Sequence, residues 1–289
     1  MSKCARSIAL RPVRYDPSHD SIYLVEENVS SSTITRGCLH PTRGLPAIAD
    51  NSIDHTITDP PFEKHTHEKR RRIKKKRVIH RDMGFDAMDS EQRVVVAAEI
   101  VRVTRGWALI FCEDTAIKLW QDALIAAGAK RWVTCIWTKP NASANFTGMG
   151  PAQPCEHFVC VWCGKGASVW NGGGKVGHYH YAIDKYNRKH HTEKPLELME
   201  QIILDFTMPG QLICDPYMGS GHTLVAAKKL GRRYIGWEID SKPYQAAKDR
   251  LLVTREQTMI EQMLHHRVSR KRAFGLDKGK KAKQLVLTK

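Results

Sequence analysis

Residues 212–221 read Leu-Ile-Cys-Asp-Pro-Tyr-Met-Gly-Ser-Gly, and they are the strongest indication of the fold. The segment Gln211 to Cys214 predicts a short buried strand, because it is mostly apolar and is followed directly by turn residues. Gly219 and Gly221 then predict a sharp turn, since glycine adopts dihedral angles closed to other residues and lets a ligand approach the backbone. A helix is predicted immediately after this turn, from Thr223 to Leu230.

An acidic residue follows the next strand along the chain. Tyr234 to Trp237 predicts that strand, and Glu238 comes 23 residues after Asp215. A carboxylate at this distance, at the end of the second strand, commonly binds the hydroxyl groups of a nucleotide ribose. The turn is not Gly-x-Gly-x-x-Gly, so it does not indicate a dinucleotide. A purely structural strand-turn-helix junction is an equal alternative for the turn alone, and Glu238 favours the ligand-binding interpretation.

The rest of the chain alternates predicted strands with predicted helices. Such alternation predicts an α/β fold with a mostly parallel sheet and helices on both faces. The predicted domain spans residues 21–254, after an irregular N-terminal arm (1–20) and before a basic C-terminal tail (255–289). The other predicted strands are Ser21–Glu26, Ile53–Thr58, Trp107–Cys112, Trp132–Trp137 and Glu156–Trp162, and the other predicted helices are Ser90–Arg105 (with Ser90 as N-cap), Thr115–Ala127, Leu196–Thr207 and Lys242–Leu252.

A second motif, Asp59-Pro60-Pro61-Phe62, follows the strand predicted to end at Thr58. The prolines cannot continue a ladder, so a loop begins at the carboxyl edge of the sheet, where ligands bind in such folds. An exocyclic base amine is a poor nucleophile because its lone pair is delocalised into the ring. The Asp59 carboxylate and the Pro60 carbonyl offer acceptors for its hydrogens, and Phe62 offers a stacking face for a flipped base. A turn or helix cap is the common alternative for this motif alone.

The net charge of +16 is concentrated in two segments. Residues 63–81 contain ten Lys or Arg and two Glu, and residues 255–289 contain ten Lys or Arg and three acidic residues. Because the rest of the chain is close to neutral, these segments favour a polyanionic partner over a merely solvated surface. The segment 63–85 has no apolar period and is predicted to be a basic loop that contacts DNA through Lys69, Arg70, Arg71, Arg72, Lys74, Lys75, Lys76 and Arg77.

Four motifs in order resemble the S-adenosylmethionine-dependent DNA amino-methyltransferases of the β arrangement, in which Asp-Pro-Pro precedes the cofactor-binding half. They are Ile-Thr-Asp-Pro-Pro-Phe (57–62), His-Thr-Glu-Lys-Pro-Leu (191–196), Asp-Pro-Tyr-Met-Gly-Ser-Gly (215–221) and Tyr-Ile-Gly-Trp-Glu-Ile-Asp (234–240). The resemblance implies a seven-stranded sheet and S-adenosyl-L-methionine as cofactor. It also implies catalytic roles for Asp59, Pro60, Pro61 and Phe62, Lys194 near the methionine end of the cofactor, Glu238 on its ribose, and further cofactor contacts from Asp215, Pro216, Tyr217, Gly219, Ser220 and Gly221.

Within this family, Asp at the first motif position favours methylation of adenine N6, whereas cytosine N4 enzymes more often carry Ser. Three alternatives stay open: cytosine N4 methylation of DNA, N6 methylation of adenine in RNA, and a nucleic-acid-binding protein that keeps the fold without catalysis. With no nuclease signature, the sequence resembles a solitary or phage-type modification enzyme. The segment 164–190, short for the family, is the expected target-recognition segment.

The expected partner is duplex DNA, and pairing of two copies into a homodimer is left open. The sequence shows no signal-peptide pattern and no apolar run of membrane-spanning length, which predicts a cytoplasmic protein, in a bacterium or a phage-infected host, with reduced thiols. Cys160 and Cys163 have a spacing seen in zinc sites, but Cys160 lies in an apolar predicted strand. The downstream His178 and His180 also lack the usual His spacing, so no metal is predicted. Two interpretations of Trp170, Tyr179 and Tyr181 carry equal weight, a DNA contact and a small core.

Overall fold

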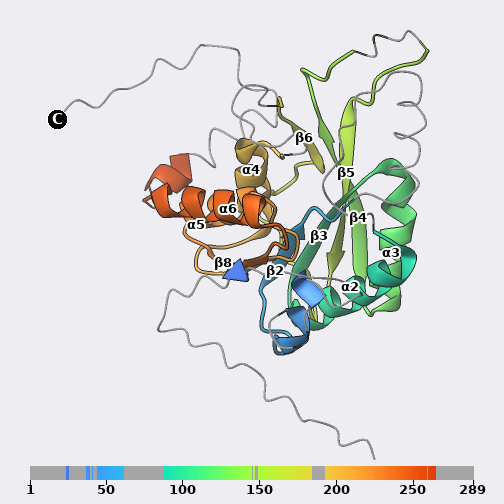
Figure 1. The fold of residues 1–289 in the computed structure, drawn as a ribbon, viewed down its shortest axis with the longest axis vertical. Coiled ribbons are helices and arrows are strands. Elements are labelled where there is room, and N and C mark those ends of the chain that lie inside the picture. The colour runs from blue at the N-terminus through green and yellow to red at the C-terminus, as the bar shows by residue number, and fades with distance from the viewer. Residues whose placement is uncertain are drawn as a thin grey trace, which may run out of the picture.

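The computed structural model describes residues 24–25, 37–39, 41, 44–61, 88–144, 146, 149–183, 193–258 and 260–264. Within these residues, eight strands form one sheet in the order β1-β8-β7-β2-β3-β5-β4-β6 (Figure 1). Neighbouring strands are parallel except where β5 runs antiparallel to β3 and β4. The predicted α/β fold with a mostly parallel sheet is therefore confirmed.

All seven strands predicted from the sequence are present, and their ends move by a few residues at most. The eighth strand, β6, lies at the edge of the sheet beside β4. The strands are β1 (Leu24–Val25), β2 (His55–Thr58), β3 (Trp107–Cys112), β4 (Arg131–Thr138), β5 (Cys155–Trp162), β6 (His178–His180), β7 (Leu212–Asp215) and β8 (Arg233–Trp237). The helices are α2 (Ser90–Val103), α3 (Ile117–Ala126), α4 (Leu196–Phe206), α5 (His222–Lys229) and α6 (Ser241–Val253), with 3-10 turns η1 (Gly37–Leu39), η2 (Leu45–Ala47) and η3 (Asp114–Ala116).

The start of α2 differs from the prediction by one residue. Asp89, not Ser90, is the N-cap: its carboxylate accepts a hydrogen bond from the Gln92 N–H at 2.8 Å, and the Gln92 side chain accepts one from the Asp89 N–H at 3.4 Å. This reciprocal capping box satisfies two backbone N–H groups that have no partner within the helix. Ser90 becomes the first helical residue.

Helices cover both faces of the sheet, and β3 shows why. Its side chains are all buried and alternate between two clusters, as the two-residue period of a strand requires. Ala108, Ile110 and Cys112 lie in the cluster that contains α2 and α3. Trp107, Leu109 and Phe111 lie in the cluster that contains α4 and α5. On the side of the sheet that carries α4 and α5, α6 packs on α5 (Figure 1).

Near the centre of the sheet, β2 is fully buried although three of its four side chains are polar. Each of the three has a partner. His55 Nδ1 accepts from the Trp107 N–H at 3.0 Å, and its Nε2 lies 3.0 Å from the Gln211 side-chain oxygen. Thr56 pairs with the Thr104 hydroxyl at 2.7 Å, and Thr58 donates to Asp215 at 2.7 Å. These hydrogen bonds offset the cost of burying polar groups and fix β2 between its neighbours.

The order of the strands creates a crevice between β2 and β7. From β2 the chain continues to β3 on one side, whereas β7 returns to the other side of β2 and continues outward to β8. His55 is paired with Ile213 and Thr56 with Cys214, so the two strands end at the same edge. Open α/β sheets bind ligands at the carboxyl ends of their strands, at such a reversal of order. Asp59 follows β2 and Asp215 ends β7, so the two sequence motifs meet at this crevice.

The segment 164–190, read as irregular from the sequence, contains β6 and part of the core. Tyr179 is 1% exposed, and its ring centroid lies 5.4 Å from that of Phe158. The Trp170 ring meets Phe206 edge-on at 4.7 Å, and Tyr181 packs against the same cluster. The three aromatic residues therefore belong to the core, which was one of the two interpretations. Among the helices of the described residues, none has the length and apolar character to cross a membrane.

Candidate active site

The glycine turn after β7 combines a left-handed backbone with open space. Gly219 and Gly221 have φ angles of 52° and 86°, in the region that favours glycine. Gly221 is the N-cap of α5, and a Cβ atom there would lie 2.8 Å from the Cβ of Ala247 in α6. At Gly219, by contrast, an added Cβ would have no heavy atom within 4 Å among the described residues beyond its chain neighbours. The backbone of Gly219 therefore faces room for a ligand.

Asp215 lies beneath this turn and links it to the second motif. The residue is 2% exposed, and its Oδ1 accepts from the Thr58 hydroxyl at 2.7 Å and from the Tyr217 N–H at 3.1 Å. Burial raises the pKa of Asp215 to about 6, and the hydrogen bonds from Thr223 and Thr58 oppose this shift. Asp215 thus holds the turn against β2. The side chain of Tyr217 points back to η1, where it is hydrogen-bonded with Cys38.

Glu238 follows β8 and faces the same turn. Its Oε1 accepts from the Asp240 N–H at 2.8 Å. Burial raises the pKa of Glu238 to about 6, whereas backbone N–H groups, including that of Gly219, act to lower it. The Met218 N–H donates to the Trp237 carbonyl at 3.0 Å, which holds the ends of β7 and β8 together. The carboxylate expected to bind a ribose therefore lies beside the glycine turn.

Lys194 lies just before α4 and connects the crevice to the Asp-Pro-Pro motif. Its ammonium group lies 2.5 Å from Asp59 Oδ2 and 3.1 Å from Glu156 Oε2. The same nitrogen lies 5.0 Å from the centre of the Phe111 ring. The Lys194 side chain is only 7% exposed, so these protein groups replace most of its water. Lys139 directly follows β4, and its ammonium group pairs with the other oxygen of Glu156.

The protonation states of this cluster follow from its pairing. Burial acts to lower the pKa of Lys194, but the carboxylates of Asp59 and Glu156 raise it above its ordinary value. For Glu156, burial acts to raise the pKa, and the two lysines together lower it. Burial raises the pKa of Asp59, while Lys194 acts against that shift. The cluster therefore alternates in charge along Lys139, Glu156, Lys194 and Asp59.

The residue before Lys194 is fixed to the glycine turn. Ser220 donates its hydroxyl to Glu193 Oε1 at 2.5 Å, and Arg250 of α6 lies 2.8 Å from the same oxygen. Arg250 also donates to the Ser220 carbonyl at 2.9 Å. The three side chains hold Lys194 at a set distance from the turn, because charge-assisted hydrogen bonds are short and directional.

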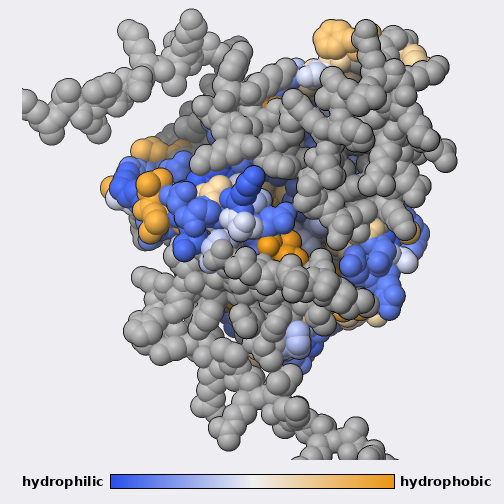
Figure 2. All heavy atoms as spheres, in the orientation of Figure 1, coloured by the Kyte–Doolittle hydropathy of each residue, from blue (hydrophilic) through white to orange (hydrophobic). Residues whose placement is uncertain are grey.

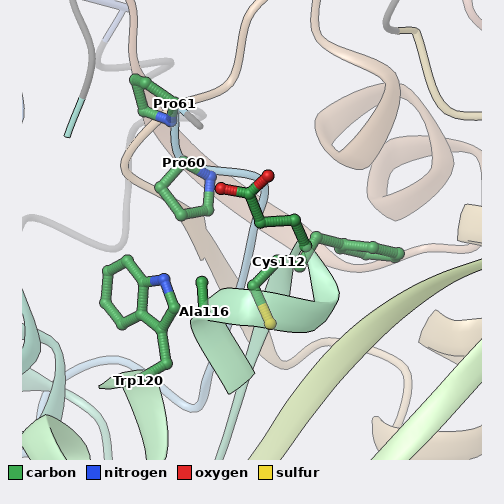
Figure 3. Close-up of a pocket in the computed structure, with 7 residues that line it drawn as sticks. Pro60, Pro61, Cys112, Ala116 and Trp120 are labelled. Atoms are coloured by element: carbon green, nitrogen blue, oxygen red, sulfur yellow. The ribbon is translucent and has the colours of Figure 1, made fainter. Parts of the chain in front are cut away.

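A small pocket adjoins the Asp-Pro-Pro motif (Figure 3). Figure 3 shows Pro60 and Pro61 on one side of it and Trp120 on the other, with Cys112 and Ala116 between. Phe111 and Glu113 complete the lining. Proline and indole rings give the pocket flat apolar walls, which suit contact with a planar ring.

The structure brings together most of the site residues predicted from the sequence. Asp59, Pro60, Pro61, Lys194, Asp215, Gly219, Ser220, Gly221 and Glu238 lie around the ends of β2, β7 and β8, with Pro216 buried in the turn. Phe62 and the basic residues Lys69 to Arg77 lie outside the described residues. Sequence reasoning missed Glu156, Lys139, Glu193 and Arg250. Of these only Glu193 stands in a quoted motif, beside Lys194, and that position is the one signal that would have found it.

Comparisons with known proteins find similarity to DNA methyltransferases. Residues 161–249 match a family model described as DNA methylase. The type II methyltransferase M.HinfI of Haemophilus influenzae is 25% identical over 260 residues, which cover 79% of this chain and 71% of that protein. The type II methyltransferase M2.DpnII of Streptococcus pneumoniae is 46% identical, but over 69 residues that cover 24% of this chain and 26% of that protein.

Solved structures share the fold. The M1.HpyAVI–SAM complex has a TM-score of 0.53 at 27% identity, covering 69% of this chain and 90% of that one. PvuII DNA methyltransferase, described as cytosine-N4-specific, has a TM-score of 0.54 at 14% identity, covering 81% of this chain and 90% of that one, which shows the fold alone. In sequence and in fold, the chain is therefore similar to S-adenosylmethionine-dependent DNA amino-methyltransferases.

Proposed function

We propose that this protein transfers a methyl group from S-adenosylmethionine to N6 of an adenine flipped out of duplex DNA. The observation that carries the proposal is the adjacency of the two motifs. Asp59 follows β2, the glycine turn follows the neighbouring β7, and the Thr58–Asp215 hydrogen bond of 2.7 Å joins them. A base amine on Asp59 and a methyl donor over the turn would then share one crevice, as direct transfer between two substrates needs.

The residues around the glycine turn fit the cofactor. Open space adjoins Gly219, and Glu238 offers a carboxylate at the position that binds ribose hydroxyls in related folds. Lys194 carries a positive charge that suits the carboxylate of the methionine end. When bound, the cofactor supplies an electrophilic methyl group on sulfur. The protein therefore has no need of a covalent intermediate of its own.

The task of the protein is to make the base amine nucleophilic. In the proposed reaction, Asp59 and the Pro60 carbonyl accept hydrogen bonds from the two amine N–H groups, which draws the lone pair out of the ring and directs it toward the methyl group. The N–C bond forms as the S–C bond breaks, S-adenosylhomocysteine leaves, and the methylated nitrogen loses one proton to water. Phe62 stacks on the flipped base. Adenine is favoured over cytosine because Asp, not Ser, stands at the first motif position.

The test is methyl transfer by the purified protein to unmethylated genomic DNA, with the modified nucleosides identified by mass spectrometry. N6-methyladenine in duplex DNA is the expected product. N4-methylcytosine would overturn the choice of base, and methylation of structured RNA but not DNA would overturn the choice of nucleic acid. Absence of transfer to any of these substrates would contradict the proposed function as a whole.

Asp59→Ala is the matching variant. Its turnover is expected to fall by about 10²–10³, because one positioned acceptor of developing charge typically contributes that much. The affinity for S-adenosylmethionine, measured by calorimetry on the same preparation, is expected to stay nearly unchanged. Asp122→Ala is the control. Asp122 is a 61% exposed aspartate on α3, and among the described residues it forms an ion pair with its helical neighbour Lys118. Near-normal turnover in Asp59→Ala would remove Asp59 from the reaction.

A further inference from the structure

The ammonium group of Lys194 occupies the acceptor that the substrate needs. It lies 2.5 Å from Asp59 Oδ2, and in the proposed reaction the same carboxylate must receive a hydrogen bond from the base amine. Lys194 therefore draws on the negative charge of the carboxylate that the amine needs. This bears directly on turnover, because a carboxylate paired with an ammonium group polarises a neutral amine less well.

Lys194 cannot simply be released into water. Its side chain is 7% exposed, and the Phe111 ring lies under the ammonium group at 5.0 Å. Leaving a buried ammonium group without any anionic partner is strongly unfavourable, whether the partner is removed or engaged elsewhere. A second anion within reach is therefore required if Asp59 is to turn toward the base.

Glu156 is that second anion. Its Oε2 lies 3.1 Å from the Lys194 nitrogen, and Oε1 is held by Lys139. The position of Glu156 is set by the sheet: it faces Trp137 in the antiparallel β4–β5 pair, at the same edge as the end of β2. Lys139 and Lys194 thus bind different oxygens of Glu156. The lowered pKa of Glu156 is consistent with a permanently ionised partner.

We infer that Glu156 is a positioning residue that takes over the ammonium group of Lys194 when the target amine binds Asp59. The inference rests on the proposed function and adds to it a partner exchange: Lys194 gives up its contact with Asp59 and keeps its contact with Glu156. No covalent bond forms or breaks in this step, and no proton is transferred. Asp59 is thereby free to polarise the amine, and the charge of Lys194 stays compensated throughout.

Glu156→Gln tests this exchange, because it keeps the shape of the side chain and removes its charge. The turnover number is expected to fall roughly 10-fold to 100-fold, less than for a group that touches the reacting atom. The KM for DNA is expected to change by less than about threefold, since the exchange concerns a single hydrogen bond of the flipped base. Glu156→Asp keeps the negative charge and is expected to recover a large part of the turnover.

Two further variants separate this role from simple packing. Lys139→Gln removes the neighbour on the other oxygen of Glu156 and leaves Lys194 with both carboxylates, so its turnover should exceed that of Glu156→Gln clearly. Asp122→Asn, on the exposed face of α3, should equal the parent. The inference is overturned if Glu156→Gln keeps normal turnover, or if Lys139→Gln loses as much. An unmodified protein that methylates nothing would instead contradict the proposed function itself, as stated above.

Discussion

At the scale of single residues, neighbours set the charge of each group in the crevice. Asp59, Asp215 and Glu238 all have raised pKa values because burial disfavours their ionised forms, whereas the pKa of Glu156 is lowered by two lysines. The crevice therefore holds two carboxylates, Asp215 and Glu238, that change protonation near pH 6. Of these two, only Glu238 is proposed to bind the ribose, so its titration should be visible in cofactor binding.

The affinity for S-adenosylmethionine is expected to depend on pH through Glu238. Ribose hydroxyls donate to the ionised carboxylate, so affinity is full above its pKa of about 6 and is lost as the pH falls through that value. The loss can reach at most about tenfold per pH unit for a single group. Calorimetric titrations between pH 8 and pH 5 would measure it.

Glu238→Gln is the control for this pH dependence. The amide should bind the cofactor more weakly at pH 8, and its affinity should change little with pH. Asp215, whose pKa is also about 6, is present in both proteins, so the difference between the two curves isolates Glu238. Parallel curves for parent and variant would show that Glu238 does not bind the ribose.

At the scale of elements, the amino end of α5 depends on two glycines for different reasons. Gly219 needs its φ of 52° but has open space around it, whereas Gly221 has a φ of 86° and also touches α6 at Ala247. The close approach of α5 and α6 thus requires a glycine at position 221. Gly219 is proposed to face the cofactor, whereas Gly221 allows the two helices to pack.

These two roles predict different losses of stability. Gly219→Ala is expected to lower the free energy of unfolding by about 1–2 kcal/mol, the cost of a left-handed dihedral for a residue with a Cβ. Gly221→Ala is expected to cost about 1–3 kcal/mol more, because its Cβ would lie 2.8 Å from Ala247 and force α5 and α6 apart. Urea unfolding would measure both. Equal losses of unfolding free energy in the two variants would mean that α5 and α6 can move apart without destabilising the protein.

At the scale of the whole molecule, charge and apolar surface are distributed unevenly. The described residues on either side of the basic segment 63–85 are Pro61, which lines the pocket, and Met88, which is 3% exposed. The loop therefore starts at the proposed base-binding motif. Figure 2 shows hydrophobic residues exposed among charged ones on the side where α6 lies. Pairing of two copies through such a surface stays open. The exposed apolar residues there are Leu252, Val253, Ile260, Met263 and Leu264.

The basic loop is expected to provide much of the affinity for DNA. Replacing Arg70, Arg71, Arg72, Lys74, Lys75 and Lys76 with Ser should flatten the dependence of log affinity on log salt by several units, since each phosphate contact contributes roughly −0.9 on B-form DNA. The affinity for S-adenosylmethionine should not change. Deletion of residues 270–289 is the comparison: if that deletion flattens the slope and the loop variant matches the parent, the DNA contacts lie in the tail.

The sequence by itself determined the fold class, the seven predicted strands and the two motifs, because each depends on neighbouring residues. A glycine turn after a buried strand, or two prolines after another, constrains the backbone locally whatever surrounds it. It did not reveal β6, since the three residues His178–His180 are too few to show a period of two. It also placed the N-cap of α2 one residue late.

Only the tertiary structure decided which charges meet. Lys194 and Asp59 are 135 residues apart, and they come together because β7 returns to the side of β2 and the chain before α4 crosses the end of the sheet. Glu156 joins them because β5 runs antiparallel, which brings its first residues to the edge where its neighbours end. Strand order and direction follow from the burial of both faces of the sheet, which is a property of the whole chain, and no local motif encodes them.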